Sequence, residues 1–153
     1  MMRRMVTMLM LAGAAVMLPA CGGYQLRGKV VEGTQPGVVV VDDGDPRLKS
    51  VGIGGASVEV MLDPMYVNRK TLGKVYSGGD GTFALPVGEF GAGVLEYNIS
   101  VLARERNHSF AYEQMLMPGS SKRLLIVLPR GADNYQRPDD PLGESQKFLP
   151  AVK

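Results

Sequence analysis

The sequence of 153 residues contains one cysteine and one histidine. A single cysteine, Cys21, cannot form a disulfide within the chain, so a folded domain must be stabilised by a hydrophobic core. A single histidine, His108, has no second imidazole with which to build a dyad or a histidine metal site. Because His108 lies in a polar segment beside Asn107 and Ser109, we expect a solvent-facing loop residue without a chemical role.

The chain also lacks an apolar run that is long enough to cross a bilayer, whose hydrocarbon core is about 30 Å thick. The longest such stretch, residues 5–18, is interrupted by Thr7 and Gly13 and follows Arg3 and Arg4. A basic start before a short apolar segment is typical of a secretory signal peptide.

An excess of charge is missing as well. The full chain has 17 basic and 15 acidic residues. Arg3 and Arg4 leave with the signal peptide, so 15 basic residues remain against the 15 acidic ones. Because no basic excess is left, nothing in the composition argues for a nucleic-acid partner.

The stretch Leu18-Pro19-Ala20-Cys21 follows the apolar segment directly. It resembles the lipobox of bacterial lipoproteins. The resemblance implies cleavage between Ala20 and Cys21, a diacylglyceryl group on the Cys21 thiol, and acylation of the new amino terminus with a fatty acid such as palmitate. Several acyl chains on one residue make a lasting membrane anchor. Two alternatives stay open: an unlipidated signal peptide that leaves a free thiol, and a transmembrane helix.

The residue after the cysteine is Gly22 and not aspartate. By resemblance to lipoprotein sorting in bacteria with two membranes, this favours the outer membrane. We therefore expect a protein of the bacterial cell envelope that is bound to the membrane through Cys21, and leave open whether it faces the periplasm or the cell surface.

After the anchor, short runs alternate apolar and polar residues in the manner of half-buried strands. The alternating runs are residues 24–31, 57–62, 82–87, 97–103 and 109–117, and two continuous apolar runs are residues 38–41 and 124–128. The second continuous run is expected to be central or covered on both faces. A short strand at 74–77 is expected to form a hairpin with 82–87 through four turn residues. Arg27, Lys29 and Lys74 are expected to protect edge strands.

These patterns predict an all-β fold, a single seven-stranded, Ig-like β-sandwich; the transthyretin-like form of that sandwich is what the family resemblance given below implies. We assign residues 1–20 to a lipoprotein signal peptide and 21–23 to a lipid-anchored linker. The sandwich is expected over residues 24–129. A disordered, proline-rich tail is expected over residues 130–153.

Four stretches together resemble the carboxypeptidase regulatory-like domain, a transthyretin-like sandwich. They are Leu26–Val31, Gly55–Val60, Ser77–Leu85 and Tyr97–Val101. The chain departs from that family by insertions at residues 36–52 and 65–72. The resemblance implies an accessory module without catalytic residues, and it supplies no ligand.

The sequence contains few residues in patterns typical of catalytic or metal-binding sites. Asp42, Asp43 and Asp45 lack the alternating oxygen ligands and the closing glutamate of a calcium loop, so a solvated turn is expected and no metal or cofactor. The Gly-x-Ser-x-Gly motif, which carries the nucleophilic serine of α/β-hydrolases, is absent. The four glutamates that fall on or near strands look like a solvated sheet face: Glu59, Glu96, Glu105 and Glu113. We therefore expect that the protein is not an enzyme.

The sequence thus predicts a non-catalytic, lipid-anchored envelope protein whose sandwich is a binding or structural module. Two alternatives remain. A carrier of a small molecule or glycan would need a cavity between the sheets, and an aromatic platform for such a ligand would draw on Tyr66, Tyr76, Phe90 and Tyr112. A subunit of a multiprotein envelope machine would use an edge strand or the tail to reach a protein partner.

Overall fold

The computed structural model of the chain describes residues 23–67 and 69–135. The strands are β1 (Gln25–Glu32), β2 (Gly37–Asp42), β3 (Ser57–Leu62), β4 (Lys70–Tyr76), β5 (Thr82–Pro86), β6 (Asn98–Arg104), β7 (Ala111–Leu116) and β8 (Lys122–Leu128). One short 3-10 helix, η1 (Pro46–Lys49), lies in the connection between β2 and β3.

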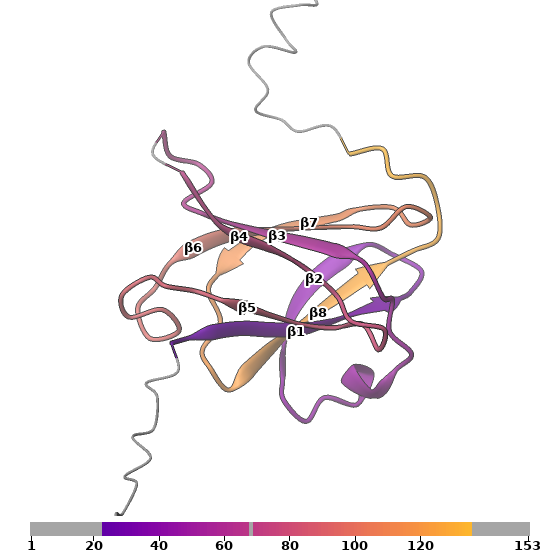
Figure 1. Cartoon of the computed structure of the whole chain (residues 1–153), viewed down its shortest axis with the longest axis horizontal. Coiled ribbons are helices and arrows are strands. Elements are labelled where there is room, and N and C mark those ends of the chain that lie inside the picture. Colours follow the sequence, from indigo (N-terminus) through magenta and orange to yellow (C-terminus); the bar gives the residue numbers. More distant parts are fainter. Residues whose placement is uncertain (1–22, 68, 136–153) are drawn as a thin grey trace, which may run out of the picture.

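The strands form two four-stranded sheets, with the orders β2-β8-β1-β5 and β4-β3-β6-β7. We call them sheet A and sheet B. Figure 1 shows sheet B lying over sheet A. Neighbouring strands are antiparallel except β1 and β8, which are parallel. The chain is therefore an all-β sandwich, as the sequence predicts.

The predicted number of seven strands is wrong, because the described residues form eight. Each of the eight runs named in the sequence becomes a strand, so the count of seven left one of them out. The valine run forms β2, which pairs with β8 from Gly37 to Asp42 and is the outermost strand of sheet A. The strand predicted at 74–77 is also longer than expected. It begins at Lys70, which pairs with Leu62 at the end of β3. The register of the β3–β4 pairing shifts between Val60 and Met61, and β4 is paired with β3 on both sides of this shift.

The predicted hairpin between β4 and β5 is wrong as well. Gly78 N–H donates to the Thr82 carbonyl oxygen at 2.8 Å, so the turn itself closes. The strands then separate: β4 pairs with β3 in sheet B, and β5 pairs with β1 in sheet A. Ser77 fixes this corner, because its buried hydroxyl donates to the Ile53 carbonyl and accepts from the Ala56 N–H. The turn therefore crosses from one sheet to the other.

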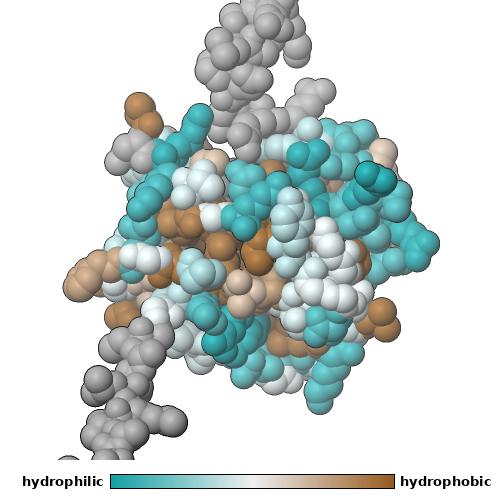
Figure 2. Space-filling model, viewed as in Figure 1, coloured by the Kyte–Doolittle hydropathy of each residue, from teal (hydrophilic) through white to brown (hydrophobic). Residues whose placement is uncertain are grey.

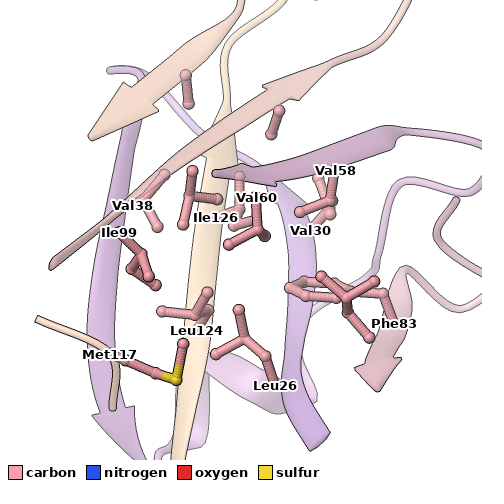
Figure 3. Packing of buried hydrophobic residues seen from close by; sticks show 14 of the residues in the cluster. Leu26, Val30, Val38, Val58, Val60, Phe83, Ile99, Met117, Leu124 and Ile126 are labelled. Atoms are coloured by element: carbon pink, nitrogen blue, oxygen red, sulfur yellow. The ribbon is translucent and has the colours of Figure 1, made fainter. Parts of the chain in front are cut away.

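The inward side chains of both sheets meet in one core (Figure 3). Its fully buried members include Leu26, Val30, Val58, Val60, Ile99, Val101, Leu124 and Ile126. Phe83 from β5 enters this core across Gly28 of β1. A Cβ on Gly28 would lie 2.6 Å from the Phe83 ring and 2.3 Å from the Leu124 carbonyl oxygen, so the core requires glycine there.

Strand β8 is covered on both faces, which confirms the prediction from its continuous apolar run. Leu124 and Ile126 point into the main core. Leu125 points the other way and forms a second cluster with Val31 and Val41. This cluster is capped by Leu48 of η1, so the connection between β2 and β3 lies over the outer surface of sheet A.

The two ends of the sandwich carry different segments. At the end that we call the N-terminal end, Tyr24 contacts the β5–β6 and β7–β8 connections: its carbonyl oxygen accepts from Val87 N–H and its hydroxyl donates to the Pro118 carbonyl. The β3–β4 connection reaches the same end, because Lys70 pairs with Glu89 at 2.5 Å. Figure 1 shows these segments at the left.

The opposite, C-terminal end carries residues 129–135, part of the segment assigned to the tail. Ser109 N–H donates to the Pro129 carbonyl at 2.8 Å, and Gly131 N–H donates to the Asn107 carbonyl at 3.1 Å. Asp133 then pairs with Arg104 at 2.7 Å. Residues 130–135 therefore contact the sandwich, and residues 136–153 lie outside the described residues.

Candidate functional site

The residues predicted to carry the anchor, Ala20 and Cys21, lie outside the described residues, as do the signal peptide and Gly22. The first described residue is Gly23. Tyr24, which follows it, is bound to the sandwich through the hydrogen bond from its hydroxyl to the Pro118 carbonyl. Among the residues described, no helix has both the length and the apolar character needed to cross a membrane.

The outer surface of sheet A carries a hollow of about 550 Å³. It is lined by outward residues of three adjacent strands and by the connection that crosses the sheet: Arg27, Lys29, Thr82, Ala84 and Arg123, with Asp43 and Leu48. Gly28 and Phe83 also reach it, and Tyr76 of β4 adds one residue from the edge of sheet B. Most of the lining is thus on the outer face of sheet A, whereas the carrier alternative placed its cavity between the sheets.

Cations predominate in this hollow. Arg27 donates through Nε and Nη2 to the neutral Gln25 side chain, at 3.1 and 2.8 Å, so its charge is not neutralised by that bond. Arg123 pairs with Asp43 at 2.8 Å. The pKa of Asp80 is lowered chiefly by the hydrogen bonds that its carboxylate accepts from Thr82, and the nearby charge of Lys29 adds a smaller contribution. The surface therefore suits an anionic ligand that also presents an apolar face.

Two of these cations were predicted to protect sheet edges, and for them that prediction is wrong. Arg27 and Lys29 lie on β1, which has neighbours on both sides in sheet A. Their alternation with Leu26 and Val30 places them on the outer face instead. Lys74 does lie on an edge strand, since β4 is the outermost strand of sheet B.

The three aspartates that follow β2 do not converge. Asp42 pairs with Lys122 at 2.5 Å, Asp43 with Arg123 at 2.8 Å and Asp45 with Arg47 at 2.8 Å. In residues 23–67 and 69–135 no group of three or more metal-ligating side chains comes together. These carboxylates instead fix the β2–β3 connection against β8 and cap η1, whose Arg47 N–H donates to Asp45.

The prediction that His108 faces solvent is wrong: only 12% of its side chain is exposed. His108 pairs with Arg130 in an isolated bridge, so the chain after β8 covers it. Its Nδ1 lies 2.5 Å from Glu105 Oε2, and its Nε2 lies 3.7 Å from Glu32 Oε2. The residues next to His108 in the sequence do not reveal this cover, because the groups that cover the turn come from β1 and from the segment after β8.

The carboxylates around His108 are held ionised. Arg130 binds Glu32 through Nε at 3.0 Å, and this hydrogen bond is the largest cause of the lowered Glu32 pKa. The Asn107 N–H is the largest cause of the lowered Glu105 pKa, followed by the hydrogen bond with His108. His108 Nε2 is buried without a hydrogen-bond partner. The cluster joins the β6–β7 turn to β1 and β8, which is a structural role.

The four candidate aromatic residues do not form one platform. Phe90 and Tyr66 lie at the N-terminal end, in the β5–β6 and β3–β4 connections. Tyr76 ends β4 at the opposite end, where Lys74 Nζ lies 5.6 Å from its ring centroid. Tyr112 lies on β7 and accepts from Gln114. None of the four is buried: their exposed fractions run from 36% for Tyr112 to 89% for Phe90.

The fold therefore defines the class of protein, an all-β sandwich with a cationic hollow on one sheet and exposed apolar connections at one end. Comparison with known proteins adds no relative: no family model, no curated protein and no solved structure matches the chain.

Proposed function

We propose that the protein is a non-catalytic, lipid-anchored component of the bacterial envelope, whose sandwich is a binding or structural module. The observation that carries this proposal is the short distance along the chain between the lipobox cysteine and the folded domain. Tyr24 is fixed by its hydrogen bonds to Val87 and Pro118, and Cys21 precedes it by three residues. Such a spacing suits a domain that is held directly at a membrane surface.

The proposal that the sandwich is a binding or structural module is supported by the places in the fold of the stretches that resemble the carboxypeptidase regulatory-like domain. Leu26–Val31 falls within β1, Gly55–Val60 leads into β3, and Ser77–Leu85 forms the corner and most of β5. Their apolar residues supply the core, and the corner serine supplies two buried hydrogen bonds. In an accessory module of the carboxypeptidase regulatory-like kind, these stretches serve the fold and not a reaction.

The experiment that tests this proposal is an intact mass of the membrane-extracted protein, combined with fractionation of Cys21→Ser. We expect the mass of residues 21–153 plus acyl groups. We expect Cys21→Ser to leave the membrane fraction in high salt and carbonate, while Ser120→Ala, at an exposed turn, stays in it. A full-length mass, or an unmodified mass of residues 21–153, would contradict the anchor.

A second candidate function rests on the cationic hollow of sheet A, which favours an acidic glycan or another anion with an apolar face. Arginine at such a site donates in a fixed planar fork to carboxylate or phosphate oxygens. We expect an acidic oligosaccharide to shift backbone amide NMR signals of β1, β5 and β8, and Arg27→Ala to weaken this binding. Arg106→Ala, at an exposed arginine of the β6–β7 connection that does not line the hollow, is the matched control. Equal shifts with a neutral oligosaccharide would contradict this function.

A further inference from the structure

Exposed apolar side chains gather at the N-terminal end of the sandwich. Among the described residues, twelve large hydrophobic side chains are exposed, and seven of these lie at this end. They are Met65, Tyr66 and Val67 in the β3–β4 connection, Phe90, Val94 and Leu95 in the β5–β6 connection, and Leu116 at the end of β7. Figure 2 shows hydrophobic side chains protruding at the left edge of the molecule. Patches of this kind mark interaction surfaces.

The β5–β6 connection is ordered although its apolar side chains are exposed. The Glu89 carbonyl accepts from Ala92 N–H at 3.2 Å, and the Gly91 carbonyl accepts from Leu95 N–H at 2.8 Å. Ala92 is buried against the core. By contrast, Phe90 is 89% exposed and Val94 is 87% exposed. The loop is thus held in a conformation that presents these two side chains to its surroundings.

This loop lies beside the point where the chain enters the sandwich. Gly93 has a φ of +79°, and a Cβ placed on it would lie 2.4 Å from the ring of Tyr24. The Tyr97 hydroxyl donates to the Phe90 carbonyl at 2.7 Å and ties the loop to the start of β6. Consecutive residues of an extended chain span at most about 3.6 Å each. Cys21, three residues before Tyr24, therefore lies within about 11 Å of it.

We infer that Phe90 and Val94 enter the lipid surface to which the acyl chains on Cys21 attach, so that the sandwich rests on the bilayer by its N-terminal end. This inference rests on the proposed lipid anchor. Aromatic and aliphatic side chains are favourable at the headgroup boundary, where an apolar part is buried beside polar groups. Tyr66 and its neighbours in the β3–β4 connection supply a second contact.

The charges of the two connections do not call for anionic headgroups, because the connections carry one cation, Arg69, against the acids Asp63, Glu89 and Glu96. Lys70 and Glu89, which flank the two connections, neutralise each other at 2.5 Å. No cation is therefore left at this pair to require anionic headgroups, and burial of apolar area supplies the attraction. A lipid surface also explains why both connections expose apolar side chains on the end that carries the chain's entry point.

The chain contains no tryptophan, so a single introduced tryptophan reports one position. The test uses the lipidated, processed protein, residues 21–153, as Phe90→Trp and Tyr76→Trp variants. They are placed in phosphatidylcholine vesicles whose acyl chains carry bromine, a quencher that acts at short range. Tyr76 is a matched control because it is aromatic and 62% exposed but lies at the opposite end. Strand β1, whose eight residues run between these ends, is roughly 23 Å long at about 3.3 Å per residue.

We expect Phe90→Trp to lose most of its fluorescence and to shift to the blue in the brominated vesicles, and Tyr76→Trp to keep its emission. Flotation of the same samples reports the anchor separately. If the protein floats and neither tryptophan is quenched, the sandwich stands away from the bilayer and the inference is wrong, while the anchor stands. If the protein does not float, the anchor itself is wrong, and the inference falls with it.

A second probe separates a lipid surface from a protein partner. Val94→Trp, also at an exposed position, is expected to be quenched in vesicles that contain only lipid and the purified protein. The opposite result would be that neither Phe90→Trp nor Val94→Trp is quenched in these vesicles, while both become protected from an aqueous quencher in native membranes. That result would overturn the lipid inference and would indicate that an envelope protein covers this surface.

Discussion

The hydroxyl of Tyr24 donates a hydrogen bond to the carbonyl oxygen of Pro118, a residue 94 positions later, with an O···O distance of 2.5 Å. The ring of the same tyrosine covers Gly93. One side chain at the entry of the chain therefore joins the β5–β6 and β7–β8 connections. This contact gives the N-terminal end a fixed geometry, and several predictions depend on it.

Removal of the Tyr24 hydroxyl should destabilise the fold. In Tyr24→Phe the ring still packs on Gly93, but the partly buried Pro118 carbonyl loses its donor. We expect the free energy of unfolding to fall by about 1 kcal/mol in chemical denaturation. Tyr66→Phe, at a side chain that is 61% exposed, is the control and should leave stability unchanged. An equal loss in both variants would contradict a role for this hydrogen bond.

The same residue makes stability sensitive to alkaline pH. Burial raises the pKa of Tyr24 from 10.0 to about 12, although nearby Arg123 opposes the shift. The folded chain therefore keeps the phenol proton at a pH where the unfolded chain releases it. This contribution is fully present below pH 10 and is lost as the pH rises towards 12. Measured against pH, the stability of Tyr24→Phe should fall less steeply in this range than that of the parent protein.

Gly93 should not tolerate a side chain. Gly93→Ala places a Cβ against the Tyr24 ring at a positive φ, and we expect a loss of about 1–3 kcal/mol in the free energy of unfolding. Gly88→Ala is the matched control in the same connection, because a Cβ there meets nothing within 4 Å. If both variants unfold at the same denaturant concentration, the close packing of Tyr24 on the loop is not present in solution.

The segment after β8 should contribute to stability. Asp133 pairs with Arg104, and the Tyr135 ring packs edge-on against Phe110 with ring centroids 5.0 Å apart. A chain that ends at residue 135 retains these contacts, and a chain that ends at residue 129 loses them. We expect the shorter chain to be less stable by about 1–2 kcal/mol, the order of one aromatic pair and one ion pair. Equal thermal midpoints would mean that residues 130–135 add nothing.

Glu105 should stabilise the C-terminal end in its ionised form. Hydrogen bonds from Asn107 N–H and His108 lower its pKa below the ordinary value of 4.5. A lowered carboxyl pKa gives stability that is present above pH 4.5 and lost as the pH falls through the folded pKa. Glu105→Gln should therefore lose on the order of 1 kcal/mol at neutral pH, and the difference should shrink in acid. Glu113→Gln, on the exposed face of β7, is the control; a difference that does not change with pH would exclude a charge effect.

Much of the local structure was predictable from the sequence. The alternation of Leu26 and Val30 with Arg27 and Lys29 predicts that β1 has one buried and one exposed face, and the structure confirms it as far as Val30. Val31, on the outer face, is instead buried in the second cluster. The continuous run at β8 predicts burial on both sides, which is also confirmed. These predictions succeed because side-chain direction in a strand has a period of two residues whatever the neighbouring strand is.

The candidate surfaces were not predictable in the same way. Strand alternation places Arg27 and Lys29 on one face, but only the strand order puts them beside Arg123 and beneath the β2–β3 connection. His108 has ordinary polar neighbours in the sequence, and its cover comes from Arg130 and Glu32, which pairing in space brings to it. A local pattern carries no information about such distant partners.

The sequence by itself determined the all-β class, the buried faces of individual strands and the expectation of an anchor at Cys21, because each depends on neighbours within a few residues. The tertiary structure alone decided that β4 and β5 belong to different sheets, that residues 130–135 pack on the sandwich, and that Phe90 lies beside the entry of the chain. These features depend on which segments meet after long loops close, and that choice is made by the packing of the whole core.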